Sequence, residues 1–259
     1  MLENIKTAVG ERLLTRLLPS GFLFRRNGYC PCCRSNTEFR ALDPWLRDHF
    51  RCRNCGSIPR QRALMVVLER LYPDWRELRI HEAGPTPGGA SALLAAECPG
   101  YVASQYRPDM PFGAQGDGFR NEDLERQTFA DESFDLVVTQ DVMEHIYDPQ
   151  RAFSEIARTL RPGGAHIFSV PLVNLHRPSE RWAARDSNGQ PRFLCKPDYH
   201  GLPGSDAYYP VTWHWGFDIC GHIERACRLQ TTIEVIDDLN QGIRANLIEI
   251  LVTHKSVDG

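Results

Sequence analysis

The stretch of residues 123–171 constrains the fold of this chain more than any other part of its sequence. Residues 134–139 read Phe-Asp-Leu-Val-Val-Thr, a short apolar and β-branched run that is typical of a strand buried on both faces. Pro149 then opens a helical pattern with its apolar positions on one face. An Arg-Pro-Gly-Gly sequence ends that pattern, and residues 165–170 read as a second strand. The stretch therefore predicts a strand–helix–strand unit.

Such a unit has two parallel strands joined by a right-handed crossover. The loops that follow Thr139 and Val170 should therefore open on the same edge of the sheet. Open α/β sheets bind their ligands at this edge, beyond the carboxyl ends of the strands. We expect the residues just after both strands to face a ligand.

At this point the chain resembles a known family. The motifs that carry the resemblance are Asp123, Phe129, Asp131, Ser133-Phe134-Asp135, the Asp141-Val142-Met143-Glu144-His145 turn and Leu160-Arg161-Pro162-Gly163-Gly164. In their order and gaps they look like the class I S-adenosylmethionine-dependent methyltransferases of the type 11 kind, over roughly residues 78–255. The resemblance implies an α/β fold with a doubly wound, mostly parallel seven-stranded sheet of the Rossmann-like kind. It says little about the substrate.

The resemblance also implies where S-adenosylmethionine would bind. The first strand should lead into Glu82, Ala83 and Gly84, where a glycine lets the backbone approach a ligand closely. The family pattern is an acidic residue followed by Gly-x-Gly-x-Gly. This chain keeps only Gly84 and a Gly88-Gly89 pair, with two prolines between them, which leaves open how the methionine moiety is held.

Further cofactor contacts are implied at the next strand ends. The positions are Gln105 and Tyr106 for the ribose, Asp123 and Leu124 for the adenine, and Gln140 and Asp141 facing cofactor and acceptor. The family usually has an acidic residue at the ribose position, and this chain does not. Two alternatives remain open: an ordinary strand end at residues 105–106, and a helix-capping role for Asp123.

Five of the nine cysteines are clustered near the N-terminus. Cys30 and Cys33 form one knuckle, and Cys52 and Cys55 form another, with 18 residues between the two. This is the spacing of a ribbon that binds tetrahedral Zn²⁺ through four thiolates. A ribbon of about 30 residues has too small a core to fold alone, so the metal should be structural. Cys32 in place of Cys30, disulfides, or plain buried thiols are the alternatives.

The charge is unevenly distributed. Residues 1–62 carry a formal charge of +7 and residues 63–259 carry −10, which gives the net charge of −3. A basic ribbon is compatible with binding to nucleic acid through phosphate contacts. The arginines concerned are Arg25, Arg26, Arg34, Arg51, Arg53, Arg60 and Arg62. They are equally compatible with a solvated module, or with ion pairs to the acidic remainder of the chain.

The acceptor is expected to meet residues 172–217, a segment punctuated by proline and rich in tyrosine and tryptophan. A long insertion at the ligand edge is typical of a lid, and aromatic rings suit a sugar face or a planar ring. Methyl transfer from a sulfonium needs alignment and, for some acceptors, a base. The candidate bases are Asp141, His145, His200 and His214, and each histidine also has a structural interpretation.

Together these observations predict three parts: an N-terminal helical segment at residues 1–28, a zinc ribbon at 29–60, and a methyltransferase domain at 61–259 with an acceptor lid at about 172–217. The expected function is methylation of an oxygen or nitrogen atom of a small-molecule or glycan-type acceptor. An RNA methyltransferase that grips its substrate with the ribbon, or a non-catalytic binding protein, are the alternatives. Mixed charges near the N-terminus and the absence of 18 consecutive apolar residues favour a cytoplasmic protein without a membrane span.

Overall fold

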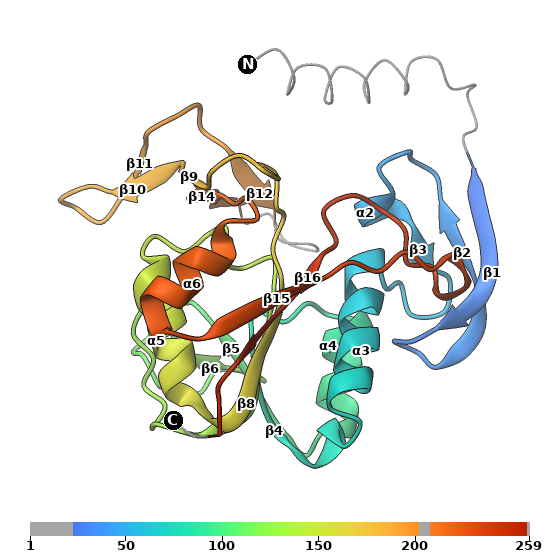
Figure 1. Ribbon diagram of the computed structural model, residues 1–259, viewed down its shortest axis with the longest axis horizontal. Coiled ribbons are helices and arrows are strands. Elements are labelled where there is room, and N and C mark those ends of the chain that lie inside the picture. Colours follow the sequence, from blue (N-terminus) through green and yellow to red (C-terminus); the bar gives the residue numbers. More distant parts are fainter. Residues whose placement is uncertain (1–22, 202–207, 258–259) are drawn as a thin grey trace.

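The computed structural model describes residues 23–201 and 208–257. It has three layers, in which a central sheet lies between helices α3 and α4 on one face and helices α5 and α6 on the other (Figure 1). A small sheet near the N-terminus packs beyond α3, and a group of short strands lies near α6 (Figure 1). Residues 1–22 of the expected N-terminal helical segment fall outside the described residues.

The central sheet has seven strands in the order β15-β16-β8-β7-β4-β5-β6. Their bounds are β4 Arg79–Ala83, β5 Gly100–Gln105, β6 Arg120–Asn121, β7 Phe134–Gln140, β8 Leu160–Ser169, β15 Gln230–Glu234 and β16 Ile250–His254. Strands β4 to β8 are parallel, whereas β16 pairs antiparallel with both β8 and β15. The mostly parallel, seven-stranded sheet implied by the resemblance is therefore confirmed.

The strand–helix–strand unit of residues 134–169 has the predicted form. Strand β7 is buried along nearly its whole length, and it pairs in parallel with β8 in the register Val138 to Ile167. Helix α5, Pro149–Thr159, begins at Asp148, whose carboxylate accepts a hydrogen bond from the backbone N–H of Arg151. The loops after β7 and β8 consequently open at the same sheet edge.

The remaining helices cover the two faces of the sheet. Helices α3, Pro59–Leu71, and α4, Gly89–Glu97, pack against one face, and α6, Ile219–Cys227, packs beside α5 on the other (Figure 1). Two short 3-10 helices, Trp75–Glu77 and Leu239–Gln241, complete the connections. No helix among the described residues is long and apolar enough to cross a bilayer.

The N-terminal module is a three-stranded antiparallel sheet. It contains β1, Phe24–Cys30, β2, Ser35–Ala41, and β3, Arg51–Cys52, with the short helix α2, Leu46–His49, between the last two. Strand β1 pairs with β2 from Phe24 onward. Residues 24–28 therefore belong to this sheet and not to the N-terminal helical segment in which the sequence analysis had placed them, because their backbone groups pair with residues 37–41.

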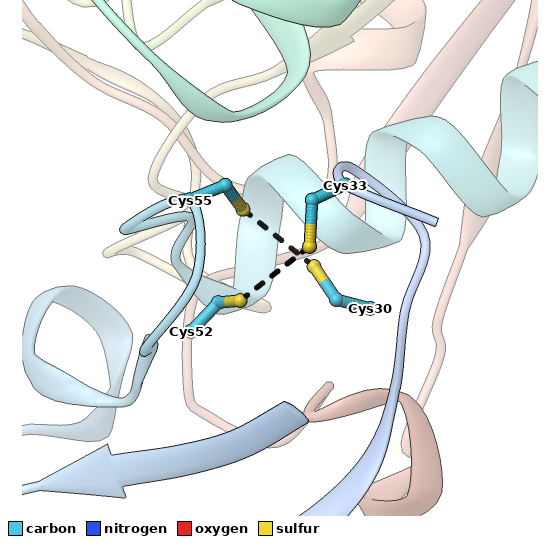
Figure 2. Close-up of side chains that lie close together, drawn as sticks. All are labelled: Cys30, Cys33, Cys52 and Cys55. Carbon is cyan, nitrogen blue, oxygen red and sulfur yellow. Dashed lines mark hydrogen bonds between the residues drawn. The ribbon is translucent and has the colours of Figure 1, made fainter. Parts of the chain in front are cut away.

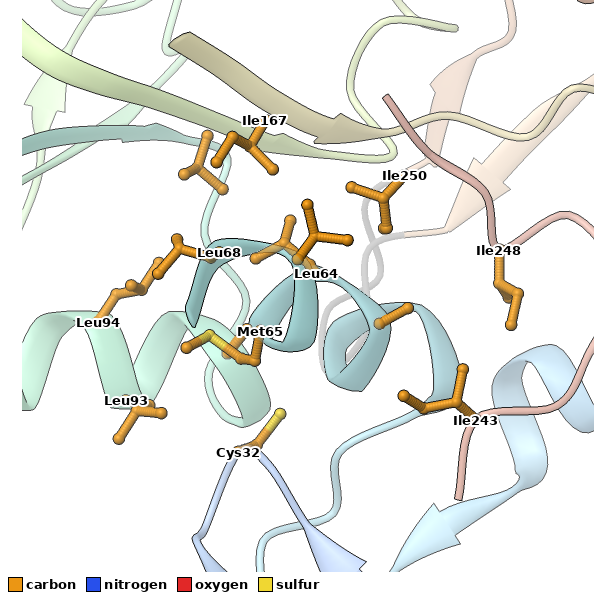
Figure 3. Close-up of a cluster of buried hydrophobic side chains, with 14 of the residues drawn as sticks. Cys32, Leu64, Met65, Leu68, Leu93, Leu94, Ile167, Ile243, Ile248 and Ile250 are labelled. Atoms are coloured by element: carbon orange, nitrogen blue, oxygen red, sulfur yellow. The ribbon is translucent and has the colours of Figure 1, made fainter. Parts of the chain in front are cut away.

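One hydrophobic core joins this module to the central sheet. Met65, Leu64 and Leu68 of α3 are fully buried between Cys32 on one side and Ile167 and Ile250 of the sheet on the other (Figure 3). Arg62 is also fully buried, and its guanidinium donates to the backbone oxygens of Phe50 and Gly242. Since apolar burial contributes about 25 cal/mol per Å², a shared core resists separation of the two parts.

The insertion at residues 172–217 contains more regular structure than its proline content predicts. Its strands are β9 Glu180–Arg181, β10 Ala183–Arg185, β11 Pro191–Phe193, β12 Tyr199–Gly201, β13 Tyr208–Pro210 and β14 Trp213–His214. They form three antiparallel pairs, β10-β11, β12-β13 and β9-β14. The prolines do not exclude strands here, because Pro191 begins β11 and Pro210 ends β13, and each takes part in a three-residue ladder.

Candidate cofactor and acceptor site

The turn after β4 is built around a buried carboxylate. Glu82 is fully buried, and its two oxygens accept hydrogen bonds from the side chains of Ser91, Tyr101 and Gln140 at 2.7 to 2.8 Å. Burial raises the pKa of Glu82, against the three hydrogen bonds. Its donors are thus all protein groups, so Glu82 orients Gln140 and ties α4 to the sheet.

Gly84 follows in a conformation that favours glycine. Its φ is +69°, and a Cβ atom there would lie 3.1 Å from a methyl carbon of Val142. The following residues of the turn, 86–89, are covered by helix α3. Gln61 of α3 donates to the hydroxyl of Thr86 at 3.1 Å, and a Cβ on Gly89 would collide with the same glutamine.

Gln140, the last residue of β7, presents an acceptor that has no protein donor. Its amide nitrogen donates to Glu82 at 2.8 Å, whereas its buried Oε1 has no hydrogen-bond partner among the described residues. A buried amide oxygen without a donor is costly, so this atom is suited to accept from a ligand. Gly84 directly follows β4 and Gln140 ends β7, the parallel strand next to it.

The adenosine end of the expected site lies along β5 and β6. Gln105 is half-buried, and Tyr106 is exposed and stacks on Phe112 with ring centroids 6.2 Å apart. Asp123 is half-buried, and its Oδ1 accepts from the backbone N–H of Glu125 at 2.9 Å. This is a local turn and no helix follows it, so Asp123 does not cap a helix as the alternative interpretation expected. Its Oδ2 makes no hydrogen bond among the described residues. Leu124 is buried beside it.

The insertion reaches the same edge of the sheet. Arg185 of β10 lies over the ring of Tyr147 with its guanidinium carbon 4.3 Å from the centroid. It also interacts with Tyr106, which raises the pKa of Arg185 against the effect of burial. Arg181 donates to the backbone oxygen of Tyr147 at 3.0 Å. The segment therefore covers part of the edge at which the resemblance places the cofactor.

Asp141 is held by two arginines of the N-terminal region. Its Oδ2 lies 2.8 Å from Nη2 of Arg47 and 2.8 Å from Nε of Arg60, and Ser169 donates to Oδ1 at 3.0 Å. Although burial opposes ionisation, the two guanidinium groups keep the pKa of Asp141 below its usual value. A carboxylate with these partners is a poor proton acceptor, so the arrangement favours a docking role over that of a base.

His145 and His200 approach the buried side chain of Glu144. Oε1 of Glu144 lies 3.8 Å from Nε2 of His145 and 3.6 Å from Nδ1 of His200. The Nδ1–H of His145 donates to the backbone oxygen of Pro210 at 2.9 Å, which leaves Nε2 with its lone pair in the neutral ring. The Glu144 carboxylate raises the pKa of His200, against burial. The structure therefore brings two of the candidate bases, His145 and His200, close to each other.

His214, the last candidate base, belongs to a different arrangement. Its ring stacks on Trp182 with centroids 3.9 Å apart, and its Nε2 lies 3.4 Å from Asp198. Burial lowers the pKa of His214, and Asp198 opposes this effect. This environment suits a residue that packs the insertion.

The four expected thiols of the N-terminal module lie together (Figure 2). The sulfur atoms of Cys30 and Cys55 are 3.7 Å apart, and those of Cys33 and Cys52 are 3.8 Å apart. Four sulfurs at about 2.3 Å from one Zn²⁺ would lie about 3.8 Å from each other. Cys32 points instead into the core toward Met65 (Figure 3). The donor set and its spacing fit a tetrahedral zinc ion.

The residues at the sheet edge also fit S-adenosylmethionine. Gly84 leaves a close approach to the backbone open, and the orphaned Oε1 of Gln140 offers an acceptor for an ammonium group. Asp123 offers a carboxylate oxygen at the adenosine end. Each group is of the type that this cofactor requires, and all three end parallel strands or the loops after them.

Comparison with known proteins agrees with this arrangement. Residues 81–168 match the family model of a methyltransferase domain. An uncharacterized methyltransferase from a Mycobacterium species is 30% identical over 103 residues, which are 34% of this chain and 41% of that protein. A ubiquinone biosynthesis O-methyltransferase from Cereibacter sphaeroides is 26% identical over 117 residues, or 38% of this chain and 47% of that protein. Residues 81–168 are thus similar to a methyltransferase domain, and the chain spans less than half the length of these curated relatives.

Solved structures with a similar arrangement include an S-adenosylmethionine-dependent methyltransferase from Mesorhizobium loti. That chain is 18% identical, with a TM-score of 0.48, and the match covers 74% of this chain and 97% of the other. A 1,6-didemethyltoxoflavin-N1-methyltransferase from Burkholderia thailandensis is 13% identical, with a TM-score of 0.46 and coverage of 76% and 78%. At these TM-scores the similarity carries no inference about function.

Several residues of the site were not foreseen from the sequence. Arg47 reaches Asp141 from far along the chain, and Gln61 and Arg185 reach the two ends of the sheet edge. No local sequence pattern predicts these contacts. The ion pair of Arg60 with Asp141, in contrast, is of the kind that the charge distribution left open for the basic arginines. Glu144 had a visible signal, since it precedes His145 directly in the turn after β7.

Proposed function

We propose that this protein is an S-adenosylmethionine-dependent methyltransferase that acts on an oxygen or nitrogen atom of a small-molecule or glycan-type acceptor. The match of residues 81–168 to a methyltransferase domain carries the proposal, because that region contains Gly84, Asp123 and Gln140 on one sheet edge. The bound cofactor supplies an activated methyl group on a sulfonium. The chain itself has to bind the cofactor and the acceptor, align them for transfer and exclude water from the site.

In this proposal, different residues bind the adenosine end and the methionine end of the cofactor. Asp123 would accept from the adenine amino group, and Gln105 and Tyr106 would lie against the ribose. Gly84 and the free Oε1 of Gln140 would hold the methionine end. Ala83 and Glu82 support this end from β4, since Glu82 fixes the amide of Gln140.

The acceptor side is proposed to be the space between the turn of residues 141–146 and the insertion. Hydrogen bonds hold the turn and the insertion together. Thr212 donates to the backbone oxygens of Glu144 and Ile146, and Trp215 donates to that of Met143. Exposed tyrosine rings of strand β13 provide flat apolar surfaces, and the ring centroid of Tyr209 lies 6.1 Å from that of His145. Such surfaces favour a sugar face or a planar ring as the acceptor.

The Zn²⁺ ion is proposed to be structural. Four thiolates fill a tetrahedral coordination sphere and leave no position for water. Arg47 of this module and Arg60, in the first turn of α3 directly after it, form ion pairs with Asp141 that fix the turn after β7. Zinc would thus support the acceptor side from a distance through these two arginines.

Calorimetric titration with S-adenosylmethionine and with its demethylated product tests the proposal. We expect one site per chain with a micromolar dissociation constant. Absence of binding by both compounds at millimolar concentration would refute the enzyme and leave a non-catalytic protein. Asp131, which is exposed and lies eight residues beyond Asp123, provides a control: Asp131→Ala should bind like the wild type. Radiolabelled transfer into fractionated host metabolites would then identify the acceptor.

RNA is a second candidate acceptor because Arg25, Arg26 and Arg51 are exposed on the N-terminal module. Binding through phosphates weakens steeply as salt rises, since each neutralised phosphate releases counterions. A filter assay with RNA at two salt concentrations separates this candidate from a small molecule. A steep loss of affinity with salt would favour RNA, and a flat or absent signal would remove it.

A further inference from the structure

We propose that Glu144, His145 and His200 form a second metal site, which holds a divalent cation beside the acceptor. The three side chains place one carboxylate oxygen and two imidazole nitrogens within 4.8 Å of one another. Two histidines and one carboxylate are a common ligand set for Zn²⁺, Mn²⁺ and Fe²⁺ in sites that keep positions open for water or substrate.

The state of Glu144 is the strongest argument for this site. Its side chain is 1% exposed, and neither carboxylate oxygen has a hydrogen-bond partner among the described residues. Burial of an ionised carboxylate without such partners costs several kcal/mol. An ion between Glu144 and the two histidines would remove that cost.

A neighbouring cation does not already satisfy Glu144. The field of Arg47 reaches it, but Nη2 of this arginine is bonded to Asp141 and Nε to the backbone oxygen of Leu247. The histidines lie beyond hydrogen-bond distance, at 3.6 and 3.8 Å. Ligands of one cation at about 2.1 Å lie about 3.0 to 3.5 Å apart, so small side-chain shifts suffice.

The orientation of His145 also suits a ligand. Its Nδ1–H donates to the backbone oxygen of Pro210, which fixes the ring and directs the Nε2 lone pair toward Glu144. Histidine ligands commonly donate their second N–H to a carbonyl in this way. The same bond joins the turn after β7 to strand β13 of the insertion. The site therefore bridges the methyltransferase domain and its lid.

The geometry leaves part of the coordination sphere open. His200 is exposed, and only three protein ligands are present among the described residues. The open positions would take water or an oxygen atom of the ligand. This part rests on the proposed function: the cation would bind a hydroxyl of the acceptor and lower its pKa, so that the proton is lost to water. The oxygen–methyl bond then forms as the sulfur–methyl bond breaks, and sulfur leaves as a neutral thioether.

Titration of the zinc-loaded protein with Mn²⁺ tests the site, because Mn²⁺ prefers carboxylate and imidazole ligands over thiolates. We expect one equivalent to bind to the wild type by calorimetry and by the electron paramagnetic resonance of bound Mn²⁺. Glu144→Gln and His200→Gln should weaken binding at least about thirtyfold. His176, an exposed histidine outside the cluster, gives the matched control, and His176→Gln should bind like the wild type.

Two outcomes would overturn the site: no Mn²⁺ or Zn²⁺ bound beyond the thiolate zinc at millimolar metal, or equal binding by Glu144→Gln and the wild type. Binding of S-adenosylmethionine, measured on the same samples, shows that each variant is folded. It also separates the two proposals. A protein that binds the nucleoside but no second ion refutes the cation site alone, whereas one that binds the ion but not the nucleoside refutes the methyltransferase alone.

Discussion

The chain contains two clusters of metal-ligating side chains, and they differ in almost every physical respect. Four thiols in the N-terminal module lie at tetrahedral spacing, next to a core that continues into the central sheet. Glu144, His145 and His200 combine one buried carboxylate with two imidazoles at the acceptor edge, and one of them is exposed. The four thiols would fill the coordination sphere of a metal ion by themselves. The three side chains of the second cluster would leave positions open for water or substrate. We therefore propose that the closed set stabilises the fold and that the open set takes part in chemistry.

Ion pairs also connect the two clusters. Arg47 lies in α2 of the N-terminal module and Arg60 lies in the first turn of α3, and both bind Asp141, three residues before Glu144. Loss of the first cluster should therefore disturb the second, whereas loss of the second should leave the first intact. The predictions below test this asymmetry in order of expected effect.

Removal of one zinc ligand should have the largest effect. Cys52→Ser should lose zinc and lower the melting temperature by about 10 °C or more, because the free energy of zinc binding contributes to folding. Differential scanning calorimetry and elemental analysis would measure both. Cys195→Ser, which alters a thiol outside the cluster, should change neither. A zinc-free wild type purified under reducing conditions would contradict the closed cluster.

Substitutions of Cys30 and Cys32 test which of these two residues is a zinc ligand. The sequence left either residue as a ligand, and the structure places Cys30 in the cluster and Cys32 in the apolar core. Cys30→Ser should lose zinc, whereas Cys32→Ser should keep it. Equal zinc loss in both variants would contradict this assignment.

Breaking the link between the clusters should come next. Asp141→Asn leaves Arg47 and Arg60 without their shared carboxylate in a largely buried position, which should cost about 3 to 5 kcal/mol in the free energy of unfolding. Asp131→Asn removes an exposed partner of Arg158 and should cost less than about 1 kcal/mol. Denaturant unfolding measures both, and similar losses would mean that the link is not a stabilising contact.

The strand–helix–strand unit of residues 134–169 was predictable, because its signals are local: two apolar runs and a proline at the start of the helix. The start of its second strand was not, since a strand was expected from residue 165 and β8 begins at Leu160 and includes the Arg-Pro-Gly-Gly sequence. The cysteine cluster was predictable from spacing for the same reason. The pairing of Arg47 with Asp141 spans 94 positions and has no local signature. The contact of Gln61 with Thr86 also depends on how α3 is laid against the sheet.

Acid should destabilise the sheet in a way that involves neither cluster. Burial lowers the pKa of His81 and of His166 to about 3, so both are neutral in the folded protein. A depressed histidine pKa contributes stability above the unfolded value near 6.5, and this contribution is lost as the pH falls toward 3. At pH 5 each should cost about 2 kcal/mol relative to pH 7.5.

Thermal unfolding of wild type and of the double variant His81→Gln, His166→Gln between pH 7.5 and 5 measures this effect. The double variant should show the smaller pH dependence. Zinc content measured at each pH controls for loss of the metal. Identical slopes at constant zinc content would mean that these two histidines are not the source.

Neutralisation of Glu144 should have the smallest effect on stability. In protein without a second cation, Glu144→Gln removes a buried charge that lacks hydrogen-bond partners among the described residues, so the melting temperature should stay equal or rise by a few degrees. This is the opposite of the result expected for Cys52→Ser. A loss of several kcal/mol would show that the carboxylate is a structural residue.

The central claim is that the cofactor is bound at the Asp123 end of the sheet edge and the acceptor is activated at the Glu144 end. Calorimetric titration of three proteins with S-adenosylmethionine tests it most directly. Wild type and Glu144→Gln should bind with similar micromolar affinity, and Asp123→Ala should bind at least about tenfold more weakly, since it loses a hydrogen bond to a charged group. Equal affinity in all three proteins, or no binding by the wild type at millimolar concentration, would contradict the account.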